Sequence, residues 1–405
     1  ITVEGLDKWV ENLTAHGVNK PTLTLSSGSI ALQNYVPSLI GNVDDYEFAK
    51  FANTTGTGTV SVSQISLDGD RFQKATETPT VSGTDIHAGY SKYGNTTNHN
   101  ILNIEETSAH VPISYTNARA GYTKALNGGS DGNTLNLNTG GTVTNGYAGY
   151  TEGVHLLVDP TSKTNPSLVD TTKNADAKNN IVNIKGGTLN AGGKLYGGYI
   201  APNAALTPPN NVSAGDAKGN TINIENGTFG GSNEIYGGYT NGTGKATGNT
   251  VNLGSDAGVF TAPTFSNVTL YGGGGASASD VITDNTLNIN AQGITAAGIH
   301  NFGKIKVNLK DAMTPYTPTN PLLTVTNASG LDWAGVEVNP EDYSGFTAST
   351  YEEKIFNAIH KTGGISFMKG STNTYNPIGA TGRLKGNYEF VIDTDNHTVK
   401  ANTDV

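Results

Sequence analysis

Two short motifs alternate along the middle of this 405-residue chain, and their repetition limits the possible folds more than any other feature. The first, the Asn motif, reads Asn-(Thr/Ile)-apolar-Asn-(Ile/Leu), and its copies begin at Asn100, Asn133, Asn180, Asn220, Asn249 and Asn285. The second, the Gly-Tyr motif, is a five-residue segment such as LYGGY (Leu195–Tyr199), and a copy follows each of the first five Asn motifs. Such self-similarity predicts stacked units that bury their apolar edges only against one another.

The spacing of the Asn motifs favours a solenoid. Successive copies begin 29 to 47 residues apart, a period that propeller blades share. A blade needs four strands, whereas each unit here has two short strands of alternating polarity and loops of variable length. We therefore predict an all-β fold, a right-handed parallel β-helix (solenoid) with irregular N-terminal and C-terminal capping regions. If each repeat makes two rungs of roughly 20 residues, equivalent positions lie about 9.5 Å apart, twice the strand spacing.

This interpretation divides the chain into three regions. Residues 1–80 are an N-terminal cap with the first rungs, residues 81–310 are the repeat β-helix core, and residues 311–405 are the C-terminal rungs and cap. Within the last region, a capping box that begins at Thr350 predicts a short helix. The segment that starts at Tyr388 predicts a hairpin. Caps of this kind are expected because an open solenoid end is an exposed sheet edge.

Side-chain directions follow from the alternation of a β-strand. In the Asn motif the rule turns the third and fifth residues inward and the fourth, an Asn such as Asn136, outward. In the Gly-Tyr motif it turns Tyr199 toward the core and turns Tyr196 and Gly198 outward. At a separation of about 9.5 Å, the outward Asn side chains of successive copies could not bond directly to one another.

Substitutions at inward and at loop positions should differ in their effect on stability. An Asp in place of inward Ile184 or Ile224 would bury an unpaired charge in a stack that has no alternative core. By contrast, Asn203 falls in a predicted loop, where we expect Ala to change stability little.

Composition excludes several classes of function. The formal net charge of −10 argues against nucleic acid as a partner, because phosphates require basic patches. The absence of cysteine excludes disulfides, thiolate metal sites and thiol catalysis. No apolar run reaches the roughly 18 residues of a membrane helix, so we expect no membrane insertion by this segment.

Motifs for catalysis are weak. Gly128–Gly132 matches G-x-S-x-G with Ser130 at its centre, but it lies in a Gly/Asn-rich stretch with no helix signal after it. Paired carboxylates such as Glu105-Glu106 and Glu352-Glu353 do not recur in register with the repeat, and solvated turns explain them more simply. We therefore predict no catalytic residue, no metal site, no cofactor and no enzyme activity.

The second position of the Gly-Tyr motif is the best candidate for binding. Its outward residues are His87, Arg119, Tyr147, Tyr196, Tyr236 and Tyr271. Beside them, the fourth position is always glycine, which would leave a strip of bare backbone next to an aromatic row. Such a strip could stack on sugars or on another protein. The alternative is a requirement of the fold, with glycine at a tight bend and tyrosine packed on its neighbours.

The recurring YGGY and NTVNL units resemble passenger domains of bacterial autotransporters, particularly large Gly/Asn/Thr-rich adhesins of Gram-negative bacteria. The segment Lys304–Gly330 is similar to the passage near the end of many such passengers. The resemblance implies a place on the bacterial cell surface, anchored through a translocator outside this sequence, or secretion.

That resemblance implies a non-catalytic adhesin passenger. Its expected partners are a host cell-surface protein or glycan, or the same protein on neighbouring cells. Two alternatives stay open: a glycan-degrading β-helix enzyme, and a structural stalk for a separate binding domain. Clustered acids that face one groove would favour the enzyme.

Overall fold

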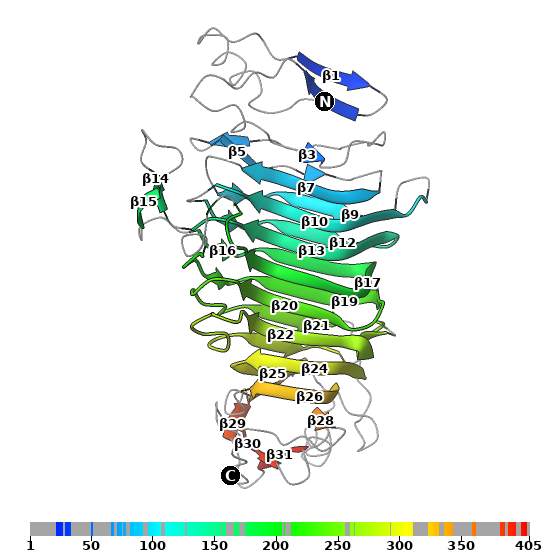
Figure 1. Cartoon of the computed structure of the whole chain (residues 1–405). Helices are drawn as coiled ribbons and strands as arrows, with labels where there is room; N and C mark the ends of the chain where they lie inside the picture. Colours follow the sequence, from blue (N-terminus) through cyan, green and yellow to red (C-terminus); the bar gives the residue numbers. More distant parts are fainter. Residues whose placement is uncertain are drawn as a thin grey trace.

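The computed structural model describes the side chains of residues 82–331 apart from 92–95, 107–109, 126–127, 155–174, 205, 207–211, 256–259, 263, 292, 307, 309–322, 324 and 326. Elsewhere it describes the backbone of individual strands. Of the 31 described strands, 21 belong to one large, mainly parallel sheet that winds round the molecule, and the others form four smaller sheets. The predicted all-β parallel solenoid is therefore confirmed, and Figure 1 shows its strands stacked along the long axis.

The Asn motifs build one ladder of parallel strands. In order along the axis these are β6 (Thr76–Glu77), β9 (Ile101–Ile104), β12 (Thr134–Leu137), the start of β17 (Ile181–Ile200), β19 (Thr221–Phe229), β21 (Thr250–Leu253), β23 (Thr286–Ile289), β25 (Lys304–Lys310), β27 (Val336–Asp342) and β29 (Thr381–Leu384). From β9 to β23 the fourth-position Asn faces the same Asn of the neighbouring turns, as Asn136 faces Asn103 on one side and Asn183 on the other.

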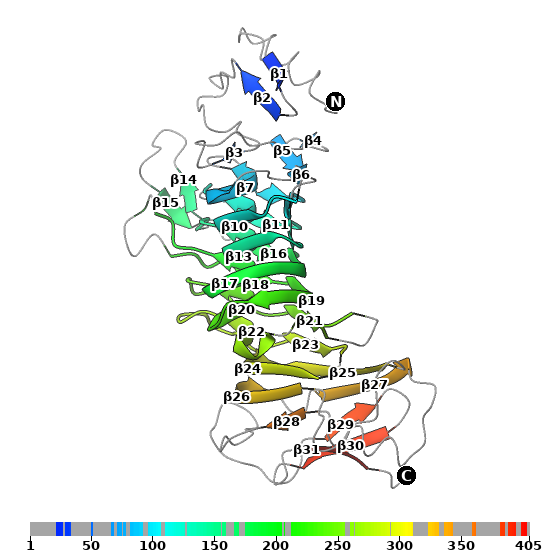
Figure 2. The ribbon, with the colours of Figure 1, turned by 90° about the vertical axis from the view of Figure 1, so that its right-hand side faces the viewer.

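The Gly-Tyr motifs build a second parallel ladder. Its strands are β7 (Gly83–Ser91), β10 (Ile113–Thr123), β13 (Gly141–Thr151), the end of β17, β20 (Asn233–Thr240), β22 (Val268–Gly274), β24 (Ile294–Phe302), β26 (Leu323–Leu331) and β28 (Ile359–Lys361). A third, short ladder consists of β8 (Thr97–Asn98), β11 (Ser130–Asp131), β16 (Ala177–Lys178) and β18 (Ala217–Lys218). In Figure 2 the first two ladders can be told apart: the Gly-Tyr strands β20, β22 and β24 lie to the left of the Asn-motif strands β21, β23 and β25.

One repeat is therefore one turn of the solenoid. A short strand, an Asn-motif strand and a Gly-Tyr strand follow one another, and the next short strand pairs with the previous one. The prediction of two rungs per repeat is wrong. Equivalent positions in successive repeats are hydrogen-bonded neighbours, so they lie one strand spacing apart, about 4.8 Å.

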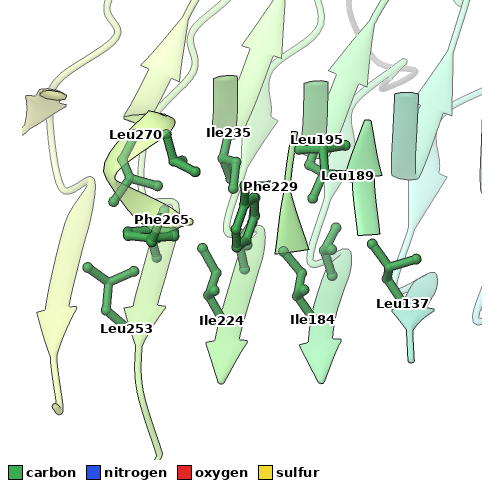
Figure 3. Packing of buried hydrophobic residues seen from close by; sticks show 14 of the residues in the cluster. Leu137, Ile184, Leu189, Leu195, Ile224, Phe229, Ile235, Leu253, Phe265 and Leu270 are labelled. Atoms are coloured by element: carbon green, nitrogen blue, oxygen red, sulfur yellow. The ribbon is translucent and has the colours of Figure 1, made fainter. Parts of the chain in front are cut away.

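The core is a stack of apolar side chains between the first two ladders. Figure 3 shows Leu137, Ile184, Ile224 and Leu253 of the Asn motifs opposite side chains that include Leu195 and Phe229. Ile184 and Ile224 are 1% and 0% exposed, as predicted from alternation. Each fully buried Leu or Ile contributes about 1.5–3 kcal/mol relative to an exposed side chain. Because each side chain packs on its counterparts above and below, no single turn has a core of its own.

A left-handed residue precedes each Asn motif and turns the chain. Positive φ angles occur at His99, Gly132, Asn179, Gly219, Gly248 and Asp284. Glycine, Asn and Asp are the residues that tolerate this conformation best. After this turn the first Asn of the motif points into the molecule, and all six such side chains are at most 2% exposed.

These buried Asn residues form a continuous amide ladder. The backbone N–H and the Nδ2 of Asn180 both donate to Oδ1 of Asn220, each at 3.0 Å. The Nδ2 of Asn220 donates in turn to Asn249 Oδ1 at 2.9 Å and to the Ala177 carbonyl at 3.0 Å. Sequence analysis missed this ladder, which satisfies buried polar groups at the corner of every turn.

The outward Asn residues form a second amide ladder, contrary to prediction. Nδ2 of Asn136 donates to Asn103 Oδ1 at 2.7 Å, and Nδ2 of Asn183 donates to Asn136 Oδ1 at 2.8 Å. The same bond continues from Asn223, Asn252 and Asn288, each to the Asn of the preceding turn. Direct bonding is possible because the repeats are one strand spacing apart.

Asn203 lies in a loop, as predicted, but its side chain is not free in solvent, so the small effect expected of Asn203→Ala stays a prediction. This side chain is 2% exposed, and its Nδ2 donates to the Glu152 carbonyl at 2.8 Å. The loop after β17 thus packs onto the preceding turn through a buried amide.

Strands β30 (Tyr388–Asp393) and β31 (Thr398–Asn402) pair antiparallel, which confirms the predicted hairpin. The helix predicted after Thr350 lies outside the described residues, as does Glu352-Glu353. The division at residues 80 and 310 stays a prediction. In the part of the chain that the structure describes, no helix has the length and apolarity that a membrane crossing requires.

Candidate functional site

The Gly-Tyr motif bends at its third residue. Tyr196 pairs with Tyr236 and Gly198 pairs with Gly238, while Gly197 between them has no partner in the register. The same position is skipped in the other pairs of this ladder that carry the motif. A Cβ on Gly197 would clash with the Gly237 carbonyl. This crowding explains the glycine at Gly197; other copies have Ala88, Ala120 or Ala148 at the third position, where the methyl group is fully buried.

The bend reverses the predicted directions of the two residues that follow. A Cβ on Gly198 would lie 2.5 Å from Asn220 Nδ2 and 2.7 Å from the Ala177 carbonyl oxygen, so this glycine faces the interior. Tyr199 is only half-buried and contacts Tyr196, whereas Ile200 after it is fully buried. The predictions of an inward Tyr199 and an exposed glycine strip are therefore wrong, because the bend shifts the alternation by one residue.

The result is a pair of adjacent aromatic columns, which we call the tyrosine face. The second-position column contains His87, Arg119, Tyr147, Tyr196, Tyr236, Tyr271 and His300. The fifth-position column contains Tyr90, Tyr122, Tyr150, Tyr199 and Tyr239. The structure thus places all six predicted binding residues in consecutive turns. Their role in binding stays a prediction.

The sequence did not lead us to expect His300 or the fifth-position tyrosines on this face. His300 continues the second-position column, stacked on Tyr271 with ring centroids 5.0 Å apart. The dipeptide Ile299-His300 repeats Ile86-His87, so the signal was present in the sequence. The fifth-position tyrosines were missed because strict alternation assigned them to the core.

Most rings within a column stack nearly parallel, from Tyr147 to Tyr271 in the second-position column and from Tyr150 to Tyr239 in the fifth-position column, whereas Tyr122 meets Tyr90 and Tyr150 at 57° and 86°. Tyr196 lies between Tyr147 and Tyr236, with centroids 5.1 and 5.2 Å away and interplanar angles of 6° and 9°. Between columns the contacts are edge-to-face, as for Tyr196 and Tyr199 at 4.7 Å and 66°. Both faces of a ring inside the stack are covered by its neighbours. The rings therefore offer edges and hydroxyl groups to a ligand, and sugar-face stacking on them is blocked.

The hydroxyl groups of the tyrosine face fall into two classes. Tyr122 donates to Glu152 at 3.2 Å, Tyr236 donates to Glu234 at 3.0 Å, and Tyr199 accepts from Asn241 at 2.7 Å. Among the described residues, four hydroxyls make no hydrogen bond and are not enclosed: those of Tyr147, Tyr150, Tyr196 and Tyr239. These groups are available to donate and to accept.

Two ion pairs lie on this face. The Arg119 guanidinium lies 4.8 Å from the ring centroids of Tyr122 and Tyr150 and forms an ion pair with Asp85 at 3.1 Å. Lys194 pairs with Glu234 at 2.6 Å. Burial raises the pKa of Tyr147 to about 12 and raises that of Tyr196 further. These phenols are therefore neutral at physiological pH.

Ser130 belongs to the interior and not to a nucleophile elbow. It is 0% exposed, lies in the short strand β11, and its Oγ accepts from Asn133 Nδ2 at 2.9 Å.

The paired carboxylates Glu105 and Glu106 do not act together. Glu105 accepts from Asn138 at 2.9 Å and Glu106 contacts His110 at 3.0 Å. The two carboxylates of this predicted pair are thus engaged with separate partners.

Two acids from adjacent turns do converge, at Asp176 and Asp216. Lys218 bridges them, with Nζ 2.7 Å from Asp176 and 3.4 Å from Asp216. Burial lowers the pKa of Lys218, but the hydrogen bonds and charges of Asp176 and Asp216 together outweigh burial and raise the pKa overall. Each carboxylate also accepts a backbone N–H of the next turn. We interpret the pair as a structural clamp between loops.

In the described parts of residues 82–331, no group of three or more His, Asp or Glu side chains could hold a metal ion. Comparison with known proteins adds no identification: the chain matches no protein-family model, no curated protein and no solved structure. Inference about function therefore rests on the residues and their geometry.

Proposed function

We propose that this protein is a non-catalytic adhesin of the bacterial cell surface, and that the tyrosine face is its binding surface. The observation that carries the proposal is the set of four unpaired hydroxyls on a stacked aromatic array, at Tyr147, Tyr150, Tyr196 and Tyr239. Tyrosines combine apolar contact area with a hydrogen-bonding tip, which is why they are frequent in binding surfaces.

Rigidity supports this proposal. Stacking along each column and edge contacts between columns hold the rings in place before any partner arrives. A side chain that is already ordered loses little conformational entropy on binding, which otherwise costs about 0.5–1.5 kcal/mol per residue. The face is therefore organised for a ligand in advance.

The chemistry of the face narrows the ligand. Its ion pairs are satisfied internally, and the covered ring faces disfavour a ligand that stacks flat on them. A partner should instead bring hydrogen-bonding groups to a row of phenol hydroxyls that repeats once per turn, about every 4.8 Å. A host protein, a glycan that presents its hydroxyls, and the same protein on a neighbouring cell all meet this condition.

Placement on the cell surface rests on the resemblance of the YGGY and NTVNL units to autotransporter passengers. A solenoid with variable loops and one continuous binding face suits display away from a membrane. Within this proposal the chain is a passenger that a translocator, encoded outside these residues, anchors in the outer membrane.

The test removes the four free hydroxyls and keeps the rings. In a variant that combines Tyr147→Phe, Tyr150→Phe, Tyr196→Phe and Tyr239→Phe, stacking is retained while each lost hydrogen bond costs about 0.5–1.5 kcal/mol. Binding to glycan and host-protein arrays, and bacterial aggregation, should fall at least about tenfold with an unchanged melting temperature.

A matched control is Tyr115→Phe, since Tyr115 is a buried tyrosine of β10 away from the face. It should bind like the parent protein. If the fourfold variant keeps full binding, the tyrosine face is not the site, and the segments at residues 159–177 and 201–215 become the next candidates.

A further inference from the structure

The two rings that lie closest together on the tyrosine face are those of Tyr236 and Tyr271. Their centroids are 4.4 Å apart and their planes differ by 10°, whereas the other ring pairs of the face are separated by 4.7–5.7 Å. They occupy equivalent positions in adjacent strands, β20 and β22, and face each other in the register. Equivalent carbons of the two rings therefore lie against each other.

Tyr236 also has a proton acceptor in place. Its hydroxyl donates to Glu234 Oε2 at 3.0 Å, and the ion pair with Lys194 at 2.6 Å holds that carboxylate in position. A phenol that is hydrogen-bonded to a base can lose its proton in the same event as an electron, which avoids a charged phenol radical.

The same site lies where the aromatic columns become incomplete. The LYGGG copy has Gly274 where the other copies have a fifth-position tyrosine. A Cβ at Gly274 would lie 2.7 Å from ring carbons of both Tyr236 and Tyr239. Tyr271 consequently has no fifth-position ring beside it in its own turn, and it is only half-buried. Tyr271 is therefore the more accessible phenol of the pair, since Tyr236 is 8% exposed.

We propose that Tyr236 and Tyr271 form an oxidative cross-linking site, which a haem peroxidase with hydrogen peroxide converts to dityrosine. Each phenol gives one electron to the peroxidase and releases its hydroxyl proton, to Glu234 from Tyr236 and to solvent from Tyr271. The two radicals join through the ring carbons next to the oxygens, and the hydrogens on those carbons move back to the oxygens. The two electrons and two protons reduce one hydrogen peroxide to two waters.

The product would be a covalent staple between consecutive turns. The chain has no cysteine, so a disulfide cannot serve this purpose. A bond between residues 236 and 271 would close a loop across β20 and β22, and loop closure stabilises a fold by restricting its unfolded state. The oxidised protein should therefore unfold at a higher temperature than the parent.

Peptide mapping of the whole chain tests the site. The protein is treated at low concentration with peroxidase and hydrogen peroxide and then cut with trypsin. Tyr236 lies in the peptide 219–245 and Tyr271 in the peptide 246–304, because the bounding cleavage sites are Lys218, Lys245 and Lys304. The expected product joins these two peptides, lacks two hydrogens and shows dityrosine fluorescence.

Variants resolve the atoms involved. Tyr271→Phe and Tyr236→Phe should each abolish the product. Because Tyr239 lies in the same peptide as Tyr236, the Tyr236→Phe variant shows which of these two tyrosines is cross-linked. Glu234→Gln should slow formation severalfold, because it removes the proton acceptor. The matched control is Tyr147→Phe, which changes a stacked tyrosine whose hydroxyl bonds no carboxylate. It should leave the yield unchanged.

Three results would overturn the proposal: cross-links spread evenly over the tyrosines of the folded chain, a product that survives Tyr271→Phe, or the same product in equal yield from chain unfolded in urea. The mapping of the unaltered protein decides the matter even if a variant fails to fold.

Discussion

The Asn motifs and the Gly-Tyr motifs repeat with equal regularity, yet their side chains obey different rules. In β9, β12, β21 and β23 burial alternates strictly between half-buried and buried positions. In β20 four consecutive residues, Ile235 to Gly238, are buried, and the alternation resumes one residue out of phase. The first motif is a straight strand and the second contains a bend.

The difference teaches where local rules stop. Alternation follows from the pleat of a strand and holds as long as the strand runs straight. At the third position of the Gly-Tyr motif the ladder loses one pairing, as a β-bulge does, and the faces exchange. The sequence marks the place only by the restriction to Ala or Gly.

The largest expected effect lies on the straight strand. Replacing Ile224 with Asp puts an unpaired charge among side chains that are fully buried, which costs several kcal/mol and can prevent folding. Thr228→Asp on the same strand, at an exposed position, should cost less than about 0.5 kcal/mol. Urea unfolding of both variants measures the contrast. Similar losses would refute the assignment of the two faces.

A loss of stability of intermediate size should distinguish the buried amide ladder from the outward one. Asn220→Ala removes the acceptor of two buried donors on Asn180, and each unsatisfied group costs about 1–3 kcal/mol. Asn223→Ala breaks similar bonds at a half-exposed position, where water can replace them, so the cost should be about 0.5–1.5 kcal/mol. Equal free energies of unfolding would mean that burial does not distinguish the ladders.

A smaller effect tests the bend itself. Gly198→Ala adds a methyl group that points at Asn220 and Ala177, and overpacking of this kind costs about 1–3 kcal/mol. Thr188→Ala, at an outward position of the same strand, serves as the control and should cost little. If Gly198→Ala is neutral in thermal unfolding, the fourth position faces outward as alternation first suggested.

Several properties of this protein follow from the sequence alone. The two motifs determine that the chain is an all-β solenoid, since neither can bury its apolar residues without neighbours. They determine which residues of the Asn motif line the core, with Leu137, Ile184 and Ile224 as examples. They also place the second-position residues at equivalent points of successive turns, because each occupies the same place in its repeat. These residues are His87, Arg119, Tyr147, Tyr196, Tyr236 and Tyr271.

Other properties were decided only by contacts between turns. A repeat of 29 to 47 residues is compatible with one turn or two, and the choice depends on which strands pair, not on any local preference. That choice brings the Asn side chains within bonding distance at both positions of the motif. The bend at Gly197, which arises from packing against Gly237 and Asn220 of the next turn, then moves Tyr199 out of the core and creates the second aromatic column.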